Sequence, residues 1–252
     1  MIESMTEIPT PDGRMEAFVT HPEEGGPFPS VVILMDIWGL REELFDLTRK
    51  VAVVGYHCTV PNFYYRQGAV RFEFRDAQGR MKSFDAISAE EQQRMRAQMA
   101  RTTDQNAMED LRSVLAFLRT QPIRPGPKAS IGYCLGGRYA LQAAAHYPDE
   151  FRASASLHGT RLAGDSPLSP HRLAASCRGE IYCGFAEHDE LAPESTRKAL
   201  AEAFAANPNV RYRAVVHAGA EHGYALPDRD VYDKQAANRD WEIFFAMLRR
   251  VL

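Results

Sequence analysis

The chain of 252 residues is 45% hydrophobic and 25% charged, and its formal net charge at pH 7 is −3. This composition is that of an ordinary globular protein, and the small net charge gives no reason to expect nucleic acid or an anionic membrane as a partner. No stretch of the sequence approaches the roughly 18 to 20 consecutive apolar residues that a transmembrane helix needs.

Cysteine usage and the first residues indicate the compartment. The cysteines at positions 58, 134, 177 and 183 form no CxxC pair and have no spacing typical of a metal site. A disulfide framework is therefore not expected, and a reducing cytoplasm fits best. The start of the sequence has neither the basic segment nor the apolar run of a signal peptide. We expect a cytoplasmic protein with one domain over residues 1–252, present as a monomer or a small homo-oligomer.

The first part of the chain alternates strands with a helix. Thr6–Thr20 reads as two short strands around a Pro-Asp-Gly turn. Ser30–Asp36 is an unbroken apolar run that ends in an acid, which is typical of a strand buried on both faces of a parallel sheet. Arg41–Val54 has an apolar face at helical spacing and ends at a glycine. His57–Pro61 is the next predicted strand.

The regular pattern breaks down from Asn62 to about Ile87, where aromatics, arginines and glycines predominate. Helical periodicity returns in Ala89–Thr120, as one helix or as two pieces. Long insertions at the carboxyl edge of a parallel sheet often build the substrate pocket. We therefore expect residues 62–105 to form a pocket, with a solvated loop as the alternative.

The second half of the chain continues the alternation. Strands are predicted at Lys128–Ile131, Ala153–His158, Glu180–Ala186 and Val210–Val216, and helices at Arg138–Tyr147, Pro193–Ala206 and Val231–Val251. Strands that alternate with helices imply an α/β fold, with a mostly parallel, twisted sheet and helices on both faces.

Gly132–Gly137, with the sequence GYCLGG, joins a predicted strand to a predicted helix and places Cys134 at the apex of the turn. The G-x-C-x-G spacing is that of the nucleophile elbow of α/β-hydrolases, with cysteine where serine is usual. Glycine lacks a Cβ atom, so strand and helix can approach closely. The helix N-terminus also favours a thiolate. A buried structural cysteine in a glycine-rich turn would give the same short pattern.

A nucleophilic cysteine needs a base and a group that orients the base, and in α/β-hydrolases the chain order is nucleophile, acid, histidine. The segment after the strand at Glu180–Ala186 offers three acids, Glu187, Asp189 and Glu190. The residues alone leave the choice among them open.

Two histidines follow the last predicted strand. His222 is the better placed, because Gly219 and Gly223 flank it in a loop beyond the strand. His217 adjoins the strand and is expected to be structural.

Taken together, these segments resemble the dienelactone hydrolase family, a cysteine branch of the α/β-hydrolases. The matching pieces are Gly132–Gly137, Asp36–Gly39, Pro61–Arg66, Asp189–Pro193 and Gly219–Tyr224. The resemblance covers nearly the whole chain and implies the α/β-hydrolase fold. It also implies a catalytic triad of Cys134, Asp189 and His222.

The resemblance implies a reaction in which the Cys134 thiolate attacks the carbonyl of a small ester, lactone or thioester. His222 would carry the proton to the leaving group, while Asp189 fixes its tautomer. The backbone N–H groups of Ile37 and Leu135 would form the oxyanion hole. Neither a metal nor an organic cofactor is expected.

Two positions depart from the family pattern. Asp36 stands where the family has a glutamate beside the thiol, so this shorter acid either helps to ionise the cysteine or only caps the following turn. The family also has an arginine shortly after the histidine, whereas here none follows His222 until Arg229. The cationic site for a substrate carboxylate is therefore expected to be incomplete, with Arg66 as a remaining candidate and a less acidic or larger ester as substrate.

Several aromatic residues are candidates for the walls of the pocket. Trp38, Phe63, Tyr64 and Tyr65 could line it or belong to the core, and His158 should lie near the site without an assigned chemical role.

Other readings remain open at this point. An acyltransferase or a hydrolase of phosphorus esters could share the fold. A relative without turnover could bind a ligand or sense oxidants through Cys134. The complete set of nucleophile, acid and histidine favours a hydrolase.

Overall fold

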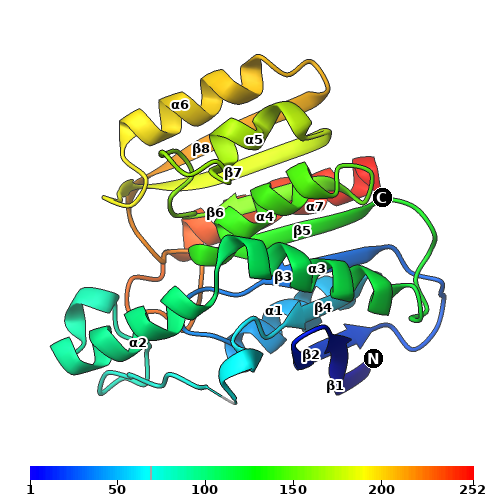
Figure 1. Ribbon diagram of the computed structural model, residues 1–252, viewed down its shortest axis with the longest axis horizontal. Coiled ribbons are helices and arrows are strands. Elements are labelled where there is room, and N and C mark those ends of the chain that lie inside the picture. The colour runs from blue at the N-terminus through cyan, green and yellow to red at the C-terminus, as the bar shows by residue number, and fades with distance from the viewer. Residues whose placement is uncertain (69) are drawn as a thin grey trace.

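The structure is a computed structural model and describes residues 1–68 and 70–252. An eight-stranded sheet forms its central layer, in the order β1-β2-β4-β3-β5-β6-β7-β8 (Figure 1). β2 pairs antiparallel with β1 and with β4, and the remaining neighbours are parallel. The predicted α/β-hydrolase fold with a mostly parallel sheet is confirmed.

The strands follow the predicted alternation. They are β1 (Ile2–Thr10), β2 (Gly13–His21), β3 (Ser30–Leu34), β4 (His57–Pro61), β5 (Lys128–Tyr133), β6 (Phe151–Leu157), β7 (Gly179–His188) and β8 (Val210–Glu221). β8 continues beyond the predicted end at Val216, so that His222 follows the strand directly.

The helices include the predicted ones and a short one that the sequence did not indicate. They are α1 (Glu42–Ala52), α2 (Ala89–Arg101), α3 (Asp104–Leu118), α4 (Leu135–His146), α5 (Pro170–Leu173), α6 (Glu194–Ala205) and α7 (Lys234–Val251), with 3-10 turns at Tyr65–Gln67, Phe84–Ala86 and Ala174–Ser176. Four residues are too few to show a helical period, which is why α5 was not predicted. Within the described ranges, no helix is both long enough and apolar enough to cross a membrane.

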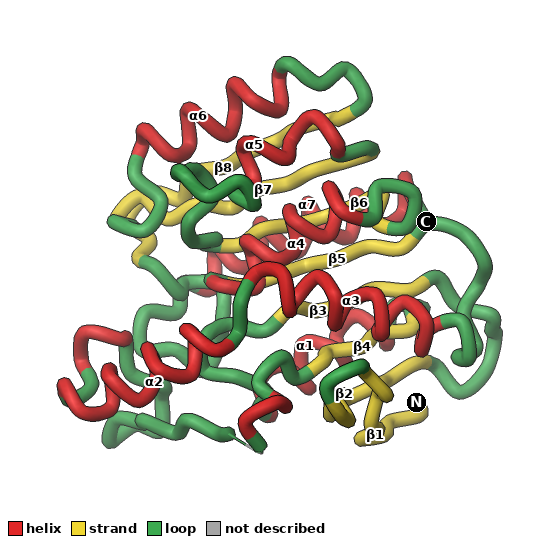
Figure 2. The backbone as a smooth tube through the Cα atoms, in the orientation of Figure 1, coloured by secondary structure: helices red, strands yellow, loops and turns green. Residues whose placement is uncertain are grey.

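Helices cover both faces of the sheet. In Figure 2, α3, α4, α5 and α6 lie in front of the strands, and α1 and α7 lie behind them. Every residue of β3 and of β5 is buried, because these central strands have helices on both sides. The carboxyl ends of these two strands lead into the candidate site.

The segment 62–105 contains two of the 3-10 turns and α2, which begins with a capping box formed by Ser88 and Glu91. It lies at the same end of the sheet as the segment that follows β8. That following segment is coloured orange in Figure 1. Contacts confirm this position, because the Phe74 ring lies 6.1 Å from the Trp38 ring and the Met81 N–H donates to the Asp228 carbonyl at 2.7 Å. The segment therefore packs on two loops of the candidate site, and its pocket-forming role stays a prediction.

Candidate active site

Cys134 lies between β5 and α4 in a strained backbone conformation, with φ 54° and ψ −113°. A positive φ at a residue with a side chain persists only where the surroundings hold it. Here the Cys134 N–H donates to the Leu157 carbonyl at 3.1 Å, and its carbonyl accepts from Gly137 at 3.1 Å and Thr160 at 3.2 Å. Both backbone groups are thus fixed, and the side chain, in a residue only 5% exposed, is held at the strand end.

The glycines around Cys134 are required by close packing. A Cβ atom at Gly132 would overlap the carbonyl of Gly136, and one at Gly136 would overlap the carbonyl of Leu34 in β3. A Cβ at Gly137 would come within 2.7 Å of Ser156 Oγ in β6. The start of α4 therefore sits directly on three strands, which is the mechanical reason for the GYCLGG sequence.

Asp189 and His222 leave two neighbouring parallel strands, β7 and β8, at the same edge of the sheet. His222 Nδ1 lies 2.8 Å from Asp189 Oδ2, and the N–H of Leu191 donates to Asp189 Oδ1 at 2.9 Å. The Asp189 side chain is fully buried, and that of His222 is 21% exposed. Because an ionised carboxylate only accepts hydrogen bonds, Nδ1 carries a proton and Nε2 is the nitrogen left for chemistry.

The other candidate acids are directed elsewhere. Glu187 is exposed and accepts a hydrogen bond from the Gly219 N–H at 2.8 Å, and Glu190 is exposed. Among the residues that the structure describes, Asp189 is the acid that contacts His222.

His217 has a structural partner in α7, as its position in the sequence suggested. Its Nε2 lies 2.7 Å from Oδ1 of the fully buried Asp240. Asp240 also accepts hydrogen bonds from the hydroxyls of Tyr182 at 2.5 Å and Tyr224 at 2.6 Å. This cluster ties α7 to β7 and β8 beneath the candidate site.

The electrostatic surroundings of His222 favour its charged form. Burial alone would lower the pKa of His222, but the charge of Cys134 and the hydrogen bond with Asp189 raise that pKa to about 10. Its Nε2 is buried and has no hydrogen-bond partner in residues 1–68 and 70–252. A histidine whose pKa is raised by the charge of a nearby cysteine can take the proton of that cysteine. This proton transfer produces a thiolate nucleophile and a general acid.

His158 lies beside His222, directly after β6, with a positive φ of 37°. The two rings meet edge to face, with their centroids 5.0 Å apart. Burial, the charge of His222 and the charge of Arg229 lower the pKa of His158 well below its ordinary value. This neutral ring therefore neighbours His222, and both its nitrogens lack partners within the described part of the chain.

Two backbone N–H groups are available at the site. Leu135 is the first residue of α4, so its N–H has no acceptor within the helix. Neither Leu135 N–H nor Ile37 N–H donates a hydrogen bond to any residue in the two described ranges. The Ile37 carbonyl accepts from the Tyr64 hydroxyl at 3.0 Å, which braces the loop between β3 and α1.

Asp36 is fully buried and pairs with Arg41, whose Nη1 donates to Oδ1 at 2.7 Å and whose Nη2 donates to Oδ2 at 3.1 Å. Its Oδ1 also accepts from the Trp38 N–H at 3.1 Å, so Asp36 does cap the following turn. A direct action of Asp36 on the Cys134 thiol stays a prediction.

Comparison with known proteins identifies the family. A model of the dienelactone hydrolase family matches residues 15–252. The chain belongs to the dienelactone hydrolase family. A protein of Methylorubrum extorquens assigned as a carboxymethylenebutenolidase is 29% identical over 248 residues, which cover 96% of this chain and 79% of that protein.

Solved structures share the fold across the whole chain. A crystal structure of a protein of Klebsiella pneumoniae assigned as a dienelactone hydrolase has a TM-score of 0.83 and 24% identity, and the match covers 99% of this chain and 98% of that one. A dienelactone hydrolase-like promiscuous phosphotriesterase from metagenomic libraries has a TM-score of 0.72 and 19% identity, over 100% and 99% of the two chains. This protein is a dienelactone hydrolase-like hydrolase.

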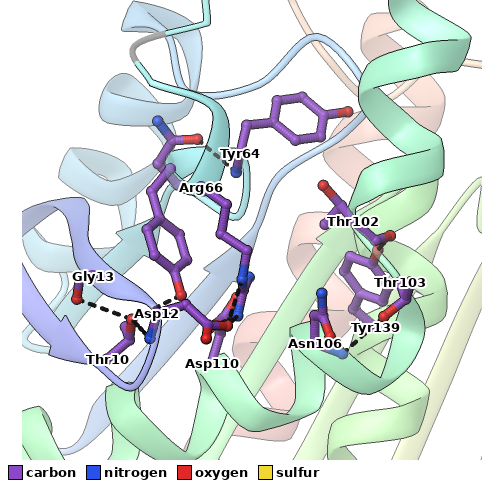
Figure 3. Close-up of polar contacts among 12 residues, drawn as sticks. Thr10, Asp12, Gly13, Tyr64, Arg66, Thr102, Thr103, Asn106, Asp110 and Tyr139 are labelled. Atoms are coloured by element: carbon purple, nitrogen blue, oxygen red, sulfur yellow. Dashed lines mark hydrogen bonds and ion pairs between the residues drawn. The ribbon is translucent and has the colours of Figure 1, made fainter.

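In this family member, Arg66 belongs to a separate polar cluster with Asp12 and Asp110 (Figure 3). Arg66 Nη1 donates to Asp110 Oδ2 at 2.7 Å, and its Nε donates to Asp12 Oδ2 at 2.8 Å. The Tyr65 hydroxyl donates to Asp110 Oδ1 at 2.9 Å. The prediction that Arg66 receives a substrate carboxylate is corrected, because two carboxylates already neutralise it. The Tyr65 hydroxyl bonds to α3 through Asp110.

The remaining aromatic candidates are buried. Phe63 packs its ring on that of Tyr139 at 5.5 Å, and Tyr64 supports Ile37 from within the core. Trp38 is 1% exposed, and its buried Nε1 has no partner in the part of the chain that the structure describes.

Arg229 lies at the candidate site, although its distance from His222 in the sequence did not predict this position. Its guanidinium lies over the Trp38 ring, 5.2 Å from the ring centroid, and a Cβ atom at Gly223 would be 2.9 Å from its Nη1. The residue is only 4% exposed, and its buried Nε has no hydrogen-bond partner among the described residues. The carboxylate of Asp230 is 3.9 Å from Nε. A weakly neutralised cation therefore lies beside the residue that follows His222.

Two successive turns bring Arg229 back to the site. The Leu226 N–H donates to the Gly223 carbonyl at 3.3 Å, and the Arg229 N–H donates to the Leu226 carbonyl at 3.0 Å. The glycine directly after His222 was the only sequence signal of this return, because it leaves space for the guanidinium.

The cysteines other than Cys134 are unsuited to nucleophilic chemistry. All four are free and buried, and burial raises the pKa of both Cys177 and Cys183 to about 12 and that of Cys58 well above its ordinary value. Among the described residues, no group of three or more His, Cys, Asp or Glu side chains is arranged to hold a metal ion.

Proposed function

We propose that this protein hydrolyses a small ester or lactone through an acyl-enzyme on Cys134, with His222 as acid and base and Asp189 as the residue that orients it. The observation that carries the proposal is the 2.8 Å hydrogen bond between Asp189 and His222, on a histidine whose pKa is raised by Cys134 at a strand-to-helix elbow. A nucleophile, an acid and a histidine in this chain order support the proposal, because the same three roles recur in covalent acyl transfer.

In the first half of the reaction, the Cys134 sulfur forms a bond with the substrate carbonyl carbon. The negative charge moves to the carbonyl oxygen, where the N–H groups of Ile37 and Leu135 stabilise it. The carbon–oxygen bond to the leaving group then breaks, and the proton on His222 Nε2 passes to the departing alkoxide. A thioester on Cys134 remains.

In the second half, His222 Nε2 takes a proton from water while the water oxygen attacks the thioester carbon. The carbon–sulfur bond breaks, the acid product leaves, and the thiolate is restored beside the protonated histidine. The two halves use the same oxyanion donors, so both loops must be well placed in each.

Substitution of the histidine and the acid tests this assignment in steady-state hydrolysis of p-nitrophenyl acetate. His222→Gln is expected to lower kcat by about 10³-fold or more, and Asp189→Asn by up to about 10⁴-fold, since it leaves the wrong tautomer. The control is His188→Gln, because the His188 side chain is 65% exposed and its neighbour Glu187 is occupied by a hydrogen bond from the Gly219 N–H. Native activity in both His222→Gln and Asp189→Asn would rule out the proposed roles.

The substrate class follows from Arg229. A buried guanidinium with one distant carboxylate as its partner is able to bind a substrate carboxylate by charge-assisted hydrogen bonds. The name of the Methylorubrum relative refers to a lactone that carries a carboxyl group, which fits such a site. We therefore propose an anionic ester or lactone as substrate, in place of the less acidic one expected from the sequence.

A further inference from the structure

Arg41 is buried between two carboxylates, one on each side of its guanidinium. Its Nη1 and Nη2 donate to Asp36 at 2.7 and 3.1 Å, and its Nε and Nη2 donate to Asp228 at 2.7 and 3.0 Å. The side chains of Arg41, Asp36 and Asp228 are 6%, 0% and 10% exposed. We call these three residues the Arg41 clamp.

The Arg41 clamp joins two loops that are far apart in the sequence. Asp36 is the last residue of the apolar run that begins with β3. It directly precedes Ile37, whose N–H is one of the proposed oxyanion donors. Asp228 lies in the segment after His222 and directly precedes Arg229. The Arg41 guanidinium thus links two segments. One is the loop that contains the proposed oxyanion donor, and the other contains the proposed carboxylate-binding residue.

The Arg41 clamp is buried, and its guanidinium is paired with a carboxylate on each side. Burial alone would lower the pKa of Arg41, but Asp36 and Asp228 together raise it, so the guanidinium stays charged. Removing one carboxylate from such a group leaves a buried charge that is only partly compensated. Nη1 also donates to the Gly39 carbonyl at 3.3 Å, which fixes the turn after Ile37.

We propose that Asp36, Arg41 and Asp228 are positioning residues that hold the Ile37 N–H where the oxyanion of the reaction forms. This inference rests on the proposed function, since an oxyanion forms only if an acyl group is transferred to Cys134. It assigns the Asp36 carboxylate to the clamp rather than to ionisation of the thiol. The clamp therefore acts on carbonyl chemistry at Cys134 and not on the reactivity of the sulfur itself.

Two reactions of the same thiol distinguish these roles. Acylation by p-nitrophenyl acetate passes through an oxyanion, whereas alkylation by iodoacetamide displaces iodide and forms none. In Asp228→Asn, we expect the acylation rate to fall by about 10- to 100-fold, below the loss of about 10²–10³ known for deleting a whole donor. The alkylation rate should stay within about twofold of the native rate, because the sulfur is unchanged.

Asp36→Asn separates the clamp from thiol activation. We expect its acylation to fall while its alkylation is preserved, as in Asp228→Asn. If alkylation fell in parallel with acylation, Asp36 would be acting on the thiol, and the clamp assignment would be overturned. Arg41→Lys keeps the charge and loses the paired contacts, so it gives the same readout if the aspartate variants do not fold.

Asp110→Asn is the matched control, because Asp110 is also a buried carboxylate on an arginine, Arg66, in the separate polar cluster. It should lower stability and leave the ratio of acylation to alkylation at the native value. An unchanged ratio in folded Asp228→Asn and Arg41→Lys would overturn the clamp alone. A native protein that is not acylated at Cys134 would overturn the proposed function, and the clamp with it.

Discussion

Two arginines of this protein, the partly exposed Arg66 and the buried Arg229, differ in the negative charge around them. Arg66 contacts the carboxylates of Asp12 and Asp110 at 2.7 Å each. The Arg229 Nε lies 3.9 Å from the Asp230 carboxylate, and the guanidinium lies over the face of the Trp38 indole. Arg229, which has the weaker carboxylate pairing of the two, is therefore the better candidate to bind an anionic substrate.

Arg229→Gln is expected to raise KM for an ester with a free carboxylate by about 10- to 100-fold, because a charged hydrogen bond contributes about 1.5–3 kcal/mol. The effect on the matching methyl-capped ester should be much smaller, since that substrate has no charge to bind. Steady-state kinetics with the two esters measures the difference. Arg66→Gln serves as the control and should leave both KM values near native. An equal rise for both esters in Arg229→Gln would contradict the assignment.

At the residue scale, the sequence predicts those features that a local pattern encodes. The glycines of GYCLGG indicate Cys134, and the glycines around His222 indicate a loop histidine. The pairing of Asp36 with Arg41, and of Arg66 with Asp110, could not be predicted, because it depends on which loops meet in the folded chain. The resemblance selected Asp189 where the pattern left three acids open.

At the scale of elements, a buried acid fastens the last helix to the last two strands. Asp240 in α7 accepts hydrogen bonds from Tyr182 in β7, from Tyr224 after β8, and pairs with His217 in β8. β8 itself extends farther than its apolar pattern indicates, because its backbone pairs with β7 up to Glu221. Backbone pairing with a neighbour leaves no periodic signal in the side chains, so this extension could not be predicted from the sequence.

Asp240→Ala is expected to lower the free energy of unfolding by about 3–5 kcal/mol, because it removes the acceptor of three buried donors. Urea unfolding followed by circular dichroism measures the change. Asp149→Ala is the control, since Asp149 forms an exposed ion pair with Arg178. Such a pair contributes at most about 1 kcal/mol. A loss in Asp240→Ala no larger than in the control would show that the cluster does not stabilise α7.

At the scale of the whole molecule, a buried histidine makes stability depend on pH. His57 in β4 is fully buried, and neither of its ring nitrogens has a partner in the described ranges. Burial and the nearby His21 lower the pKa of His57 to about 4. In the unfolded chain this histidine titrates near 6.5, so the unfolded state binds more protons between pH 6.5 and pH 4. The free energy of unfolding should therefore fall as the pH is lowered through this window.

The contribution of His57 is at most about 3 kcal/mol, because each unit of pKa shift corresponds to about 1.4 kcal/mol. His57→Phe should remove this part of the pH dependence, measured as the change in unfolding free energy between pH 7 and pH 4.5. His188→Gln should leave the dependence as in the native protein, because His188 is exposed. The same pH dependence in His57→Phe and native protein would contradict the account.

The global architecture was largely predictable, because alternating strands and helices with fully apolar central strands allow few arrangements. β3 corresponds to an unbroken apolar run and β5 to a partly apolar one, and both strands are buried throughout. The order β1-β2-β4-β3-β5 and the packing of segment 62–105 on the site loops are tertiary properties. They arise from contacts between distant segments, which a single sequence does not display.

The measurement that tests the central proposal most directly is rapid-mixing release of nitrophenol from p-nitrophenyl acetate by native protein, Cys134→Ala and Cys183→Ala. We predict a burst of about one equivalent per chain followed by steady turnover in the native protein, because acylation precedes hydrolysis of the thioester. The burst should persist in Cys183→Ala, whose thiol is buried with a pKa raised by burial to about 12, and should be absent from Cys134→Ala. An equal burst in Cys134→Ala and native protein would contradict an acyl-enzyme on Cys134.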